Sequence, residues 1–182
     1  MQSIKRLDGI LAELADRDHY LFMLSDLRPA LPHLSMTALK ALVSRAEHSG
    51  LLCRVCRGVY LYDRVVYPPG DVLFHTAARL RADCFNYISL ESALSDAGVI
   101  SQVPINWITV MTSGRGGTIR CGSWGTIEFV HTRKHPAAVQ DQLTYDRRCR
   151  LWRASVRLSL QDMRATRRNL DLVDRSLADE LV

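Results

Sequence analysis

The chain has 182 residues, of which 47% are hydrophobic and 24% are charged, as in an ordinary globular protein, and its net charge is +5. No apolar run approaches the roughly 20 residues that cross a bilayer, and the acidic residues near the start do not fit a signal peptide. We therefore expect a cytoplasmic protein without a membrane anchor, and the five cysteines, an odd number, favour free thiols.

Three helices are predicted in the first fifty residues. The first spans Ser3 to Ala15, with Ser3 as its N-cap, and the second covers Met23 to Leu31, where prolines limit its length. The third begins after Ser35 and ends before Gly50, with an apolar stripe formed by Leu39, Leu42, Val43 and Ala46.

A two-stranded hairpin is predicted directly after the third helix, in the segment LLCRVCRGVYLYD. Leu51, Cys53 and Val55 alternate with their neighbours, and Arg57-Gly58 is typical of a tight turn. Pro68-Pro69-Gly70 then interrupts the pattern. We expect one domain over residues 1–66 and a second over residues 71–182.

The second half combines helical and strand patterns. Helices are expected at Leu73–Cys84 and Leu90–Ala97, and from Asp141 to the end. Strands are expected at Tyr87–Ser89, Trp107–Met111, Thr118–Cys121 and Thr126–His131. The predicted fold class is α+β, with an N-terminal winged helix-turn-helix and a mixed C-terminal domain that has a small sheet and C-terminal helices.

The order of three helices and a hairpin is that of the winged helix-turn-helix, whose third helix enters the major groove of DNA. With the apolar stripe turned inward, Thr37, Lys40, Ser44 and Glu47 project outward, flanked by Met36 and Arg45. Arg54 and Arg57 near the hairpin tip are suited to phosphate contacts. The predicted DNA-binding residues are Thr37, Lys40, Ser44, Arg45, Arg54 and Arg57. A helical bundle with a solvated basic edge is the alternative.

Several segments resemble the AbiEi antitoxins of bacterial type IV toxin–antitoxin and abortive-infection systems. LSMTALKALVSRAEHSGLLCRVCRGVYLYD is similar to their N-terminal domain. YISLESALSDAGVISQVPINWITVMTSGRGGTIRCGSWGTIEFVHTRK resembles their C-terminal domain, and so does the later RRNLDLVD. Together these segments cover most of the chain from Ser25 to Asp174.

The resemblance implies an autorepressor that binds inverted repeats of double-stranded operator DNA, as a dimer or as a cooperative pair. It also implies a second role, in which the C-terminal domain counteracts a nucleotidyltransferase-like toxin without forming a tight complex with it. On this basis Thr37, Lys40, Arg45, Arg54 and Arg57 belong to the recognition helix and the wing. A winged-helix transcription factor without a toxin partner remains an alternative.

The C-terminal half has a second basic block, because Arg147 to Arg168 contains eight arginines against one acid, Asp162. It is either a solvated helical face or a binding surface. The candidate partner-binding residues are Arg115, Arg147, Arg148, Arg150, Arg153 and Arg157.

Other patterns favour structural roles. Cys53 and Cys56 lack a second ligand pair, and His131 and His135 lack a third ligand, so we expect no metal site. SGRGGT at 113–118 precedes a strand pattern and lacks the lysine of a phosphate loop, which favours a hairpin turn. Ser89 suits an N-cap, with Ser92 at N3. We expect no enzyme and no cofactor; an enzymatic or nucleotide-binding C-terminal domain is the alternative.

Overall fold

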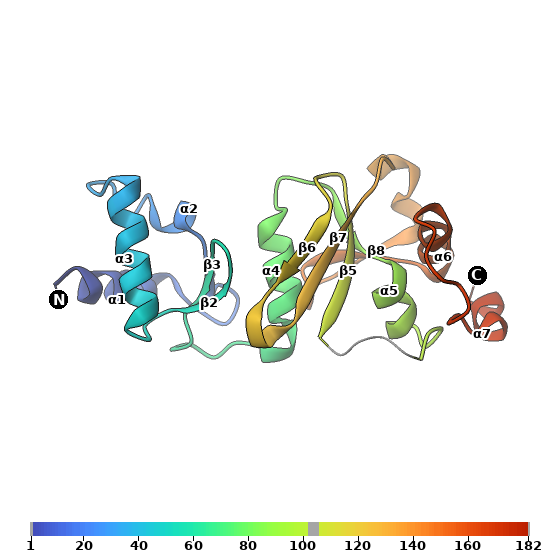
Figure 1. Ribbon diagram of the computed structural model, residues 1–182, viewed down its shortest axis with the longest axis horizontal. Helices are drawn as coiled ribbons and strands as arrows, with labels where there is room; N and C mark the ends of the chain where they lie inside the picture. The colour runs from blue at the N-terminus through green and yellow to red at the C-terminus, as the bar shows by residue number, and fades with distance from the viewer. Residues whose placement is uncertain (1, 102–105, 182) are drawn as a thin grey trace. The chain divides into compact units, whose positions relative to one another are not determined.

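A computed structural model describes residues 2–101 and 106–181 (Figure 1). The chain divides into two compact units, Met1–Gly70 and Asp71–Val182, here called the N-terminal and the C-terminal unit. The division falls directly after Pro68-Pro69-Gly70. Over the described ranges the fold is α+β, with seven α-helices, a three-stranded antiparallel sheet and a six-stranded mixed sheet.

The N-terminal unit contains three helices and three short strands. Their order is α1 (Gln2–Leu14), β1 (Leu21–Phe22), α2 (Leu24–Leu27), α3 (Met36–His48), β2 (Cys53–Cys56) and β3 (Val59–Leu61). The strands pair in the order β1-β3-β2, all antiparallel. One core joins α1, α2 and α3 to the sheet, and its fully buried members include Leu7, Leu11, Phe22, Leu27 and Leu39.

The predicted third helix and hairpin are confirmed. Ser35 caps α3, because its hydroxyl oxygen accepts a hydrogen bond from the Ala38 N–H at 3.1 Å. Gly50 follows the helix with a φ of 73°, a left-handed conformation that favours glycine. The predicted stripe of Leu39, Leu42, Val43 and Ala46 is the buried face of α3.

Three details of the N-terminal unit differ from the prediction. The helix α1 begins at Gln2, so Ser3 lies inside its first turn and is not the N-cap. The second helix ends at Leu27 instead of Leu31, because Pro29 has no N–H to donate to the Ser25 carbonyl oxygen. The strand β1 was not predicted, because two residues carry no periodicity.

The hairpin also departs from strict alternation. The register shifts between Arg54 and Cys56, so Val55 and Cys56 are both buried while Cys53 and Arg54 are both exposed. Such a shift is a β-bulge, which twists a strand and redirects its side chains. The turn at Arg57-Gly58 is as predicted, and Gly58 has a φ of 87°.

The C-terminal unit is built on the six-stranded sheet. Its helices are α4 (Val72–Leu80), α5 (Leu90–Asp96), α6 (Val156–Ala165) and α7 (Arg175–Glu180). Its strands are β4 (Asn86–Ile88), β5 (Trp107–Thr112), β6 (Gly117–Arg120), β7 (Thr126–His131), β8 (Leu143–Asp146) and β9 (Leu151–Ala154). The strand order is β6-β7-β5-β4-β9-β8. Figure 1 shows α4 on one face of the sheet, with α5 and α6 on the other.

Four short 3₁₀ helices of the described chain lie between these elements. They are η1 (Pro69–Asp71), η2 (Gly122–Trp124), η3 (Pro136–Ala138) and η4 (Gln140–Gln142).

The prediction of continuous helix from Asp141 onward is wrong. The hairpin β8–β9 occupies the first part of that segment, and α6 and α7 follow it. Asp146 closes the hairpin turn, since its carboxylate accepts hydrogen bonds from the backbone N–H groups of Arg148 at 2.9 Å and Cys149 at 3.1 Å. Arg150 adopts a φ of 58° in the same turn. The turn contains no glycine or proline, and its three arginines are good helix formers, so the sequence favoured a helix there.

The prediction that residues 113–118 form a hairpin turn is also wrong. This segment joins β5 to β6, but β7 lies between those two strands and pairs with both of them. The loop therefore crosses the end of β7. Gly116 suits the close approach there, because a Cβ atom would stand only 3.1 Å from the Phe129 carbonyl oxygen.

The helix predicted at Leu73–Cys84 spans Val72–Leu80 instead. The chain beyond it is held by Asn86, whose side-chain amide donates to the carbonyl oxygens of Arg81 at 2.6 Å and Cys84 at 2.9 Å. The four predicted strands and α5 agree with the structure to within one residue at every end. Over the described ranges no helix has the length and apolar character needed to span a membrane.

We predict that Ser35→Ala destabilises the N-terminal unit by about 1 kcal/mol, the usual cost of losing an N-cap. Hydrogen exchange of the α3 amides measures the effect. Ser44→Ala is the control, since Ser44 is exposed in the same helix and its side chain caps nothing. Equal protection of α3 in the two variants would contradict the capping role.

Candidate functional site

The exposed face of α3 carries the predicted major-groove residues. Thr37, Lys40, Ser44 and Arg45 are all exposed, while the opposite stripe is buried. At about 100° per residue, Thr37 and Ser44 lie near the centre of the exposed face, with Lys40 on one flank and Arg45 on the other. Glu47 is only partly exposed, so it lies nearer the core than expected.

The sequence argument missed one residue of this face. His48 is exposed in the last turn of α3, and its Nδ1 lies 2.7 Å from the Ser44 carbonyl oxygen. The signal was available, because His48 follows Lys40 and Ser44 at helical spacing. The face therefore combines hydroxyl, ammonium, guanidinium and imidazole groups, which can hydrogen-bond to base edges or phosphates.

The hairpin adds two exposed cations. Arg57 is exposed at the turn, and Arg54 is exposed on β2, where its Nε donates to the Cys56 carbonyl oxygen at 3.4 Å. This hydrogen bond keeps the Arg54 guanidinium close to its own strand. Both side chains are exposed, so Arg54 and Arg57 can contact a ligand.

Asp8 ties α1 to the chain that follows β3. Its carboxylate accepts hydrogen bonds from the Tyr62 hydroxyl at 3.0 Å and from Arg64 Nη1 at 2.7 Å. Burial and the hydrogen bond to Asp8 raise the pKa of Tyr62, which stays a neutral donor. The hairpin is thus anchored to the helices by a polar contact as well as by the core.

In the C-terminal unit, Arg115 lies on the crossing loop. Its side chain is exposed, and its carbonyl oxygen accepts a hydrogen bond from Arg81 Nη2 at 3.1 Å. Gly114 beside it accepts from His131 Nδ1 at 2.8 Å, if that nitrogen is protonated. Two anchors therefore present Arg115 on a fixed loop.

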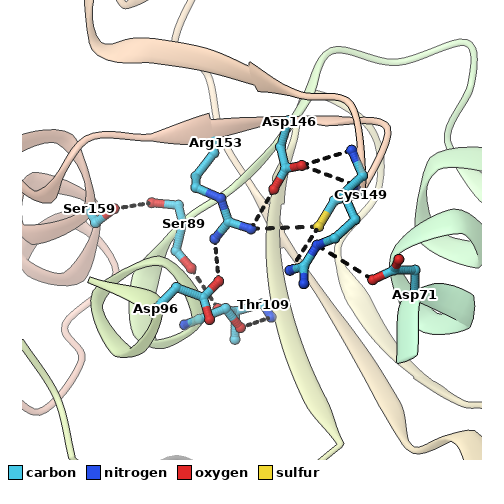
Figure 2. A network of polar contacts seen from close by, with 10 residues as sticks. Asp71, Ser89, Asp96, Thr109, Asp146, Cys149, Arg153 and Ser159 are labelled. Atoms are coloured by element: carbon cyan, nitrogen blue, oxygen red, sulfur yellow. Dashed lines mark hydrogen bonds and ion pairs between the residues drawn. The ribbon is translucent and has the colours of Figure 1, made fainter. Parts of the chain in front are cut away.

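The arginines of the second basic block fall into two groups. Arg147, Arg148 and Arg157 are exposed, and Arg150 is partly exposed. Arg153 is different, because its guanidinium forms ion pairs with Asp96 and, at 2.9 Å, with Asp146 (Figure 2). Arg153 is thus engaged within the fold by two carboxylates.

Figure 2 shows how this network continues toward α4. The Cys149 sulfur lies 3.6 Å from Arg153 Nη2 and 3.9 Å from Arg148 Nη2. Arg148 Nε lies 3.6 Å from Asp71 Oδ1, just before α4. Burial, followed by the contact with Asp146, raises the pKa of Cys149 to about 11. The thiol is therefore protonated at neutral pH and packs as a small side chain.

A fully buried carboxylate connects α6 to the sheet. Asp162 Oδ1 accepts from Lys134 Nζ at 2.6 Å, and Asp162 Oδ2 accepts from the Ser89 hydroxyl at 2.7 Å. Ser89 occupies the N-cap position of α5, as predicted, but its side chain does not cap the helix because it donates to Asp162. Ser92 lies at the N3 position, as predicted, and its hydroxyl accepts from the Thr109 N–H at 2.8 Å.

A second ionic cluster brings distant segments together. Arg168 donates to Glu91 at 3.2 Å and to Glu128 at 2.6 Å. The Trp107 indole N–H donates to the other oxygen of Glu128 at 3.3 Å. This cluster joins α5, β5, β7 and the segment after α6.

The remaining candidates show no assembled centre. Cys53 is exposed and Cys56 is buried, and both thiols are free. His131 ends β7, and His135 Nδ1 accepts from the Ala137 N–H at 3.4 Å. Within residues 2–101 and 106–181, no three His, Cys, Asp or Glu side chains are grouped to hold a metal ion.

Comparison with known proteins adds no relationship: no protein-family model matches the chain, and no curated protein matches it.

We predict that Asp146 makes the C-terminal unit sensitive to acid. Burial alone would raise the pKa of this carboxyl, but hydrogen bonds from Arg153 and the Cys149 N–H lower it from 3.8 to about 2. Ionised Asp146 therefore stabilises the fold by about 2 kcal/mol above pH 4, and this contribution is lost as the pH falls toward 2.

Urea unfolding followed by tryptophan fluorescence measures this effect, because Trp107, Trp124 and Trp152 all lie in the C-terminal unit. Asp146→Asn should be less stable at pH 7 and should lose less stability between pH 4 and pH 2. Asp141→Asn, at an exposed carboxylate, is the control. Parallel pH profiles for the wild type and Asp146→Asn would refute the assignment.

Proposed function

We propose that the protein is a DNA-binding transcriptional autorepressor and the antitoxin of a type IV toxin–antitoxin system. The N-terminal unit would act as a winged helix-turn-helix. The observation that carries this proposal is the solvated polar face of α3, which includes Thr37, Lys40 and Ser44 and is followed directly by a hairpin with exposed arginines.

The mechanism follows from the dimensions of DNA. A major groove about 12 Å wide admits one α-helix, and α3 has one polar face to offer and one face buried in the core. Its N-terminal turn would meet base edges, while Arg57 at the hairpin tip would neutralise a phosphate. Two copies on an inverted repeat would then occlude the promoter.

The antitoxin role is proposed for the C-terminal unit. The resemblance to AbiEi antitoxins rests on the segments Tyr87–Lys134 and Arg167–Asp174, of which residues 102–105 lie outside the described chain. These two segments meet, since Arg168 of the second binds Glu91 and Glu128 of the first. Asp174 also donates its backbone N–H to the Val99 carbonyl oxygen at 2.9 Å. The segments that carry the resemblance are thus in contact with one another, which supports a shared role in countering a nucleotidyltransferase-like toxin.

We predict that Lys40→Ala combined with Arg57→Ala weakens binding to the protein's own promoter by about 10- to 100-fold at 0.1 M salt. The salt dependence should also fall, by about one unit of slope for each lost phosphate contact. A gel shift over a salt series measures both quantities. The control replaces Lys5 and Arg17, two exposed cations outside α3 and the hairpin, with alanine. Unchanged affinity in the α3 and hairpin variant would disprove the assigned DNA interface.

Co-expression with the neighbouring nucleotidyltransferase-like toxin tests the antitoxin role. Wild-type protein, supplied from an unrelated promoter, should restore growth, and so should the Lys40→Ala/Arg57→Ala variant, because operator binding is then irrelevant. Arg168→Ala should lose rescue, since it frees Glu91 and Glu128 from their shared partner. Arg164→Ala, at an exposed arginine of α6, is the control, and immunoblots verify equal protein levels. Failure of the wild type to rescue growth would end the antitoxin proposal without affecting the operator proposal.

A further inference from the structure

A pocket of about 200 Å³ opens in the C-terminal unit beside the β8–β9 hairpin. Its wall combines the end of α4, the start of β4 and the facing ends of β8 and β9. The residues that matter for its chemistry are Asn86, Tyr145, Arg150 and Trp152. The pocket shares no residue with the α3 face or with the N-terminal hairpin.

Two exposed aromatic rings line this pocket. Tyr145 and Trp152 are direct cross-strand partners, and they are 47% and 44% exposed. Their ring centroids lie 5.4 Å apart at an interplanar angle of 68°. An edge-to-face pair leaves ring surface uncovered, and uncovered aromatic surface next to a hollow is suited to stacking against a flat ligand.

Asn86 lines the same pocket, and its acceptor Oδ1 is buried without a hydrogen-bond partner among the described residues. Asn86 is only 8% exposed. Its orientation is fixed, because the side-chain nitrogen already donates to the carbonyl oxygens of Arg81 and Cys84. A buried acceptor left unpaired is costly, and a ligand donor would satisfy it.

The charge around the pocket favours an anionic chain. Arg147, Arg148 and Arg150 lie in the turn of the β8–β9 hairpin, and Arg150 is part of the pocket wall. The volume is below the range of about 300–1,000 Å³ typical of drug-sized ligands, so a single ring system fits better than a whole nucleotide.

We propose that this pocket binds one nucleobase of a single-stranded nucleic acid. The base stacks on Trp152 and Tyr145, a donor on its edge meets Asn86 Oδ1, and the adjoining phosphates lie along the arginines of the turn. Asn86 Oδ1 is closed to water as the side chains stand, so the base enters as the half-exposed aromatic side chains move. Stacking is tolerant of base identity, so the site selects for a base and not for a sequence.

A strand fits better than either a duplex or a free nucleotide. In a duplex the base faces are stacked and its pairing edges are occupied. A nucleoside triphosphate is usually held by a glycine-rich loop at a helix N-terminus, whereas this pocket lies at the C-terminal end of α4. The proposal therefore stands independently of operator binding and of the antitoxin role.

Fluorescence anisotropy with a labelled 12-nucleotide strand of mixed sequence tests the proposal. The full chain carrying Lys40→Ala and Arg57→Ala is used, so that the α3 face and the N-terminal hairpin contribute little. Adding Trp152→Leu should weaken binding by about 10- to 100-fold, the range expected for one lost base stack. Trp124→Leu, in the β6–β7 connection, is the matched control and should bind normally.

A 12-residue abasic strand keeps the phosphates and removes the bases, so it should bind the protein with Trp152 intact about as weakly as the base-bearing strand binds Trp152→Leu. This comparison needs no variant at the pocket, and it stays decisive if Trp152→Leu misfolds. Equal affinity for the abasic and base-bearing strands would overturn the proposal. A duplex or AMP that binds as tightly as the strand, with the same dependence on Trp152, would overturn the assignment to single-stranded nucleic acid.

Discussion

The C-terminal unit depends most on the ion pair and the hydrogen bond made by the Asp162 carboxylate. This carboxylate is fully buried on α6, and burying a lone carboxylate costs several kcal/mol. Lys134 supplies the opposite charge at 2.6 Å, and Ser89 donates to the second oxygen. These partners lie after β7 and between β4 and α5, so one charge fixes the sheet, α5 and α6 in a single arrangement. Leu90, which follows Ser89 in the chain, is held at a φ of 57°, a strained conformation for a residue with a side chain.

The sequence predicted best the parts of the fold whose signals are local. Ser35, the apolar stripe of α3, Gly50 and Gly58 lie within 24 residues of one another, and together they specify a capped helix and a tight hairpin. The β8–β9 hairpin was missed because its turn is closed by the Asp146 side chain and by Arg150 in a left-handed conformation. The position of β7 between β5 and β6 was missed because strand order depends on long-range packing.

The candidate site likewise contains residues that the sequence could predict and residues that it could not. Exposure of Thr37, Lys40 and Ser44 follows from helical spacing once the buried stripe is known. Composition could not show which arginines of the basic block are engaged within the fold and which are exposed, because the sequence gives no sign of their ion-pair partners. In the structure Arg153 is held by two carboxylates, Arg148 is tethered to Asp71 although its side chain is 66% exposed, and Arg147 is exposed. A run of like charges is thus partly scaffold and partly surface.

The central position of β7 also constrains the order of events during synthesis. β5 and β6 leave the ribosome before β7, which is the strand that pairs with both of them. Neither pairing can form until residues 126–131 have emerged. The edge of β4 that pairs with β9 stays unpaired for longer still, because β9 begins only at Leu151. The nascent C-terminal unit therefore exposes unpaired strand edges until most of it is made, which is a period of vulnerability to aggregation and a natural point for chaperone capture. The N-terminal unit has no such delay, because every strand of its sheet is complete by Leu61.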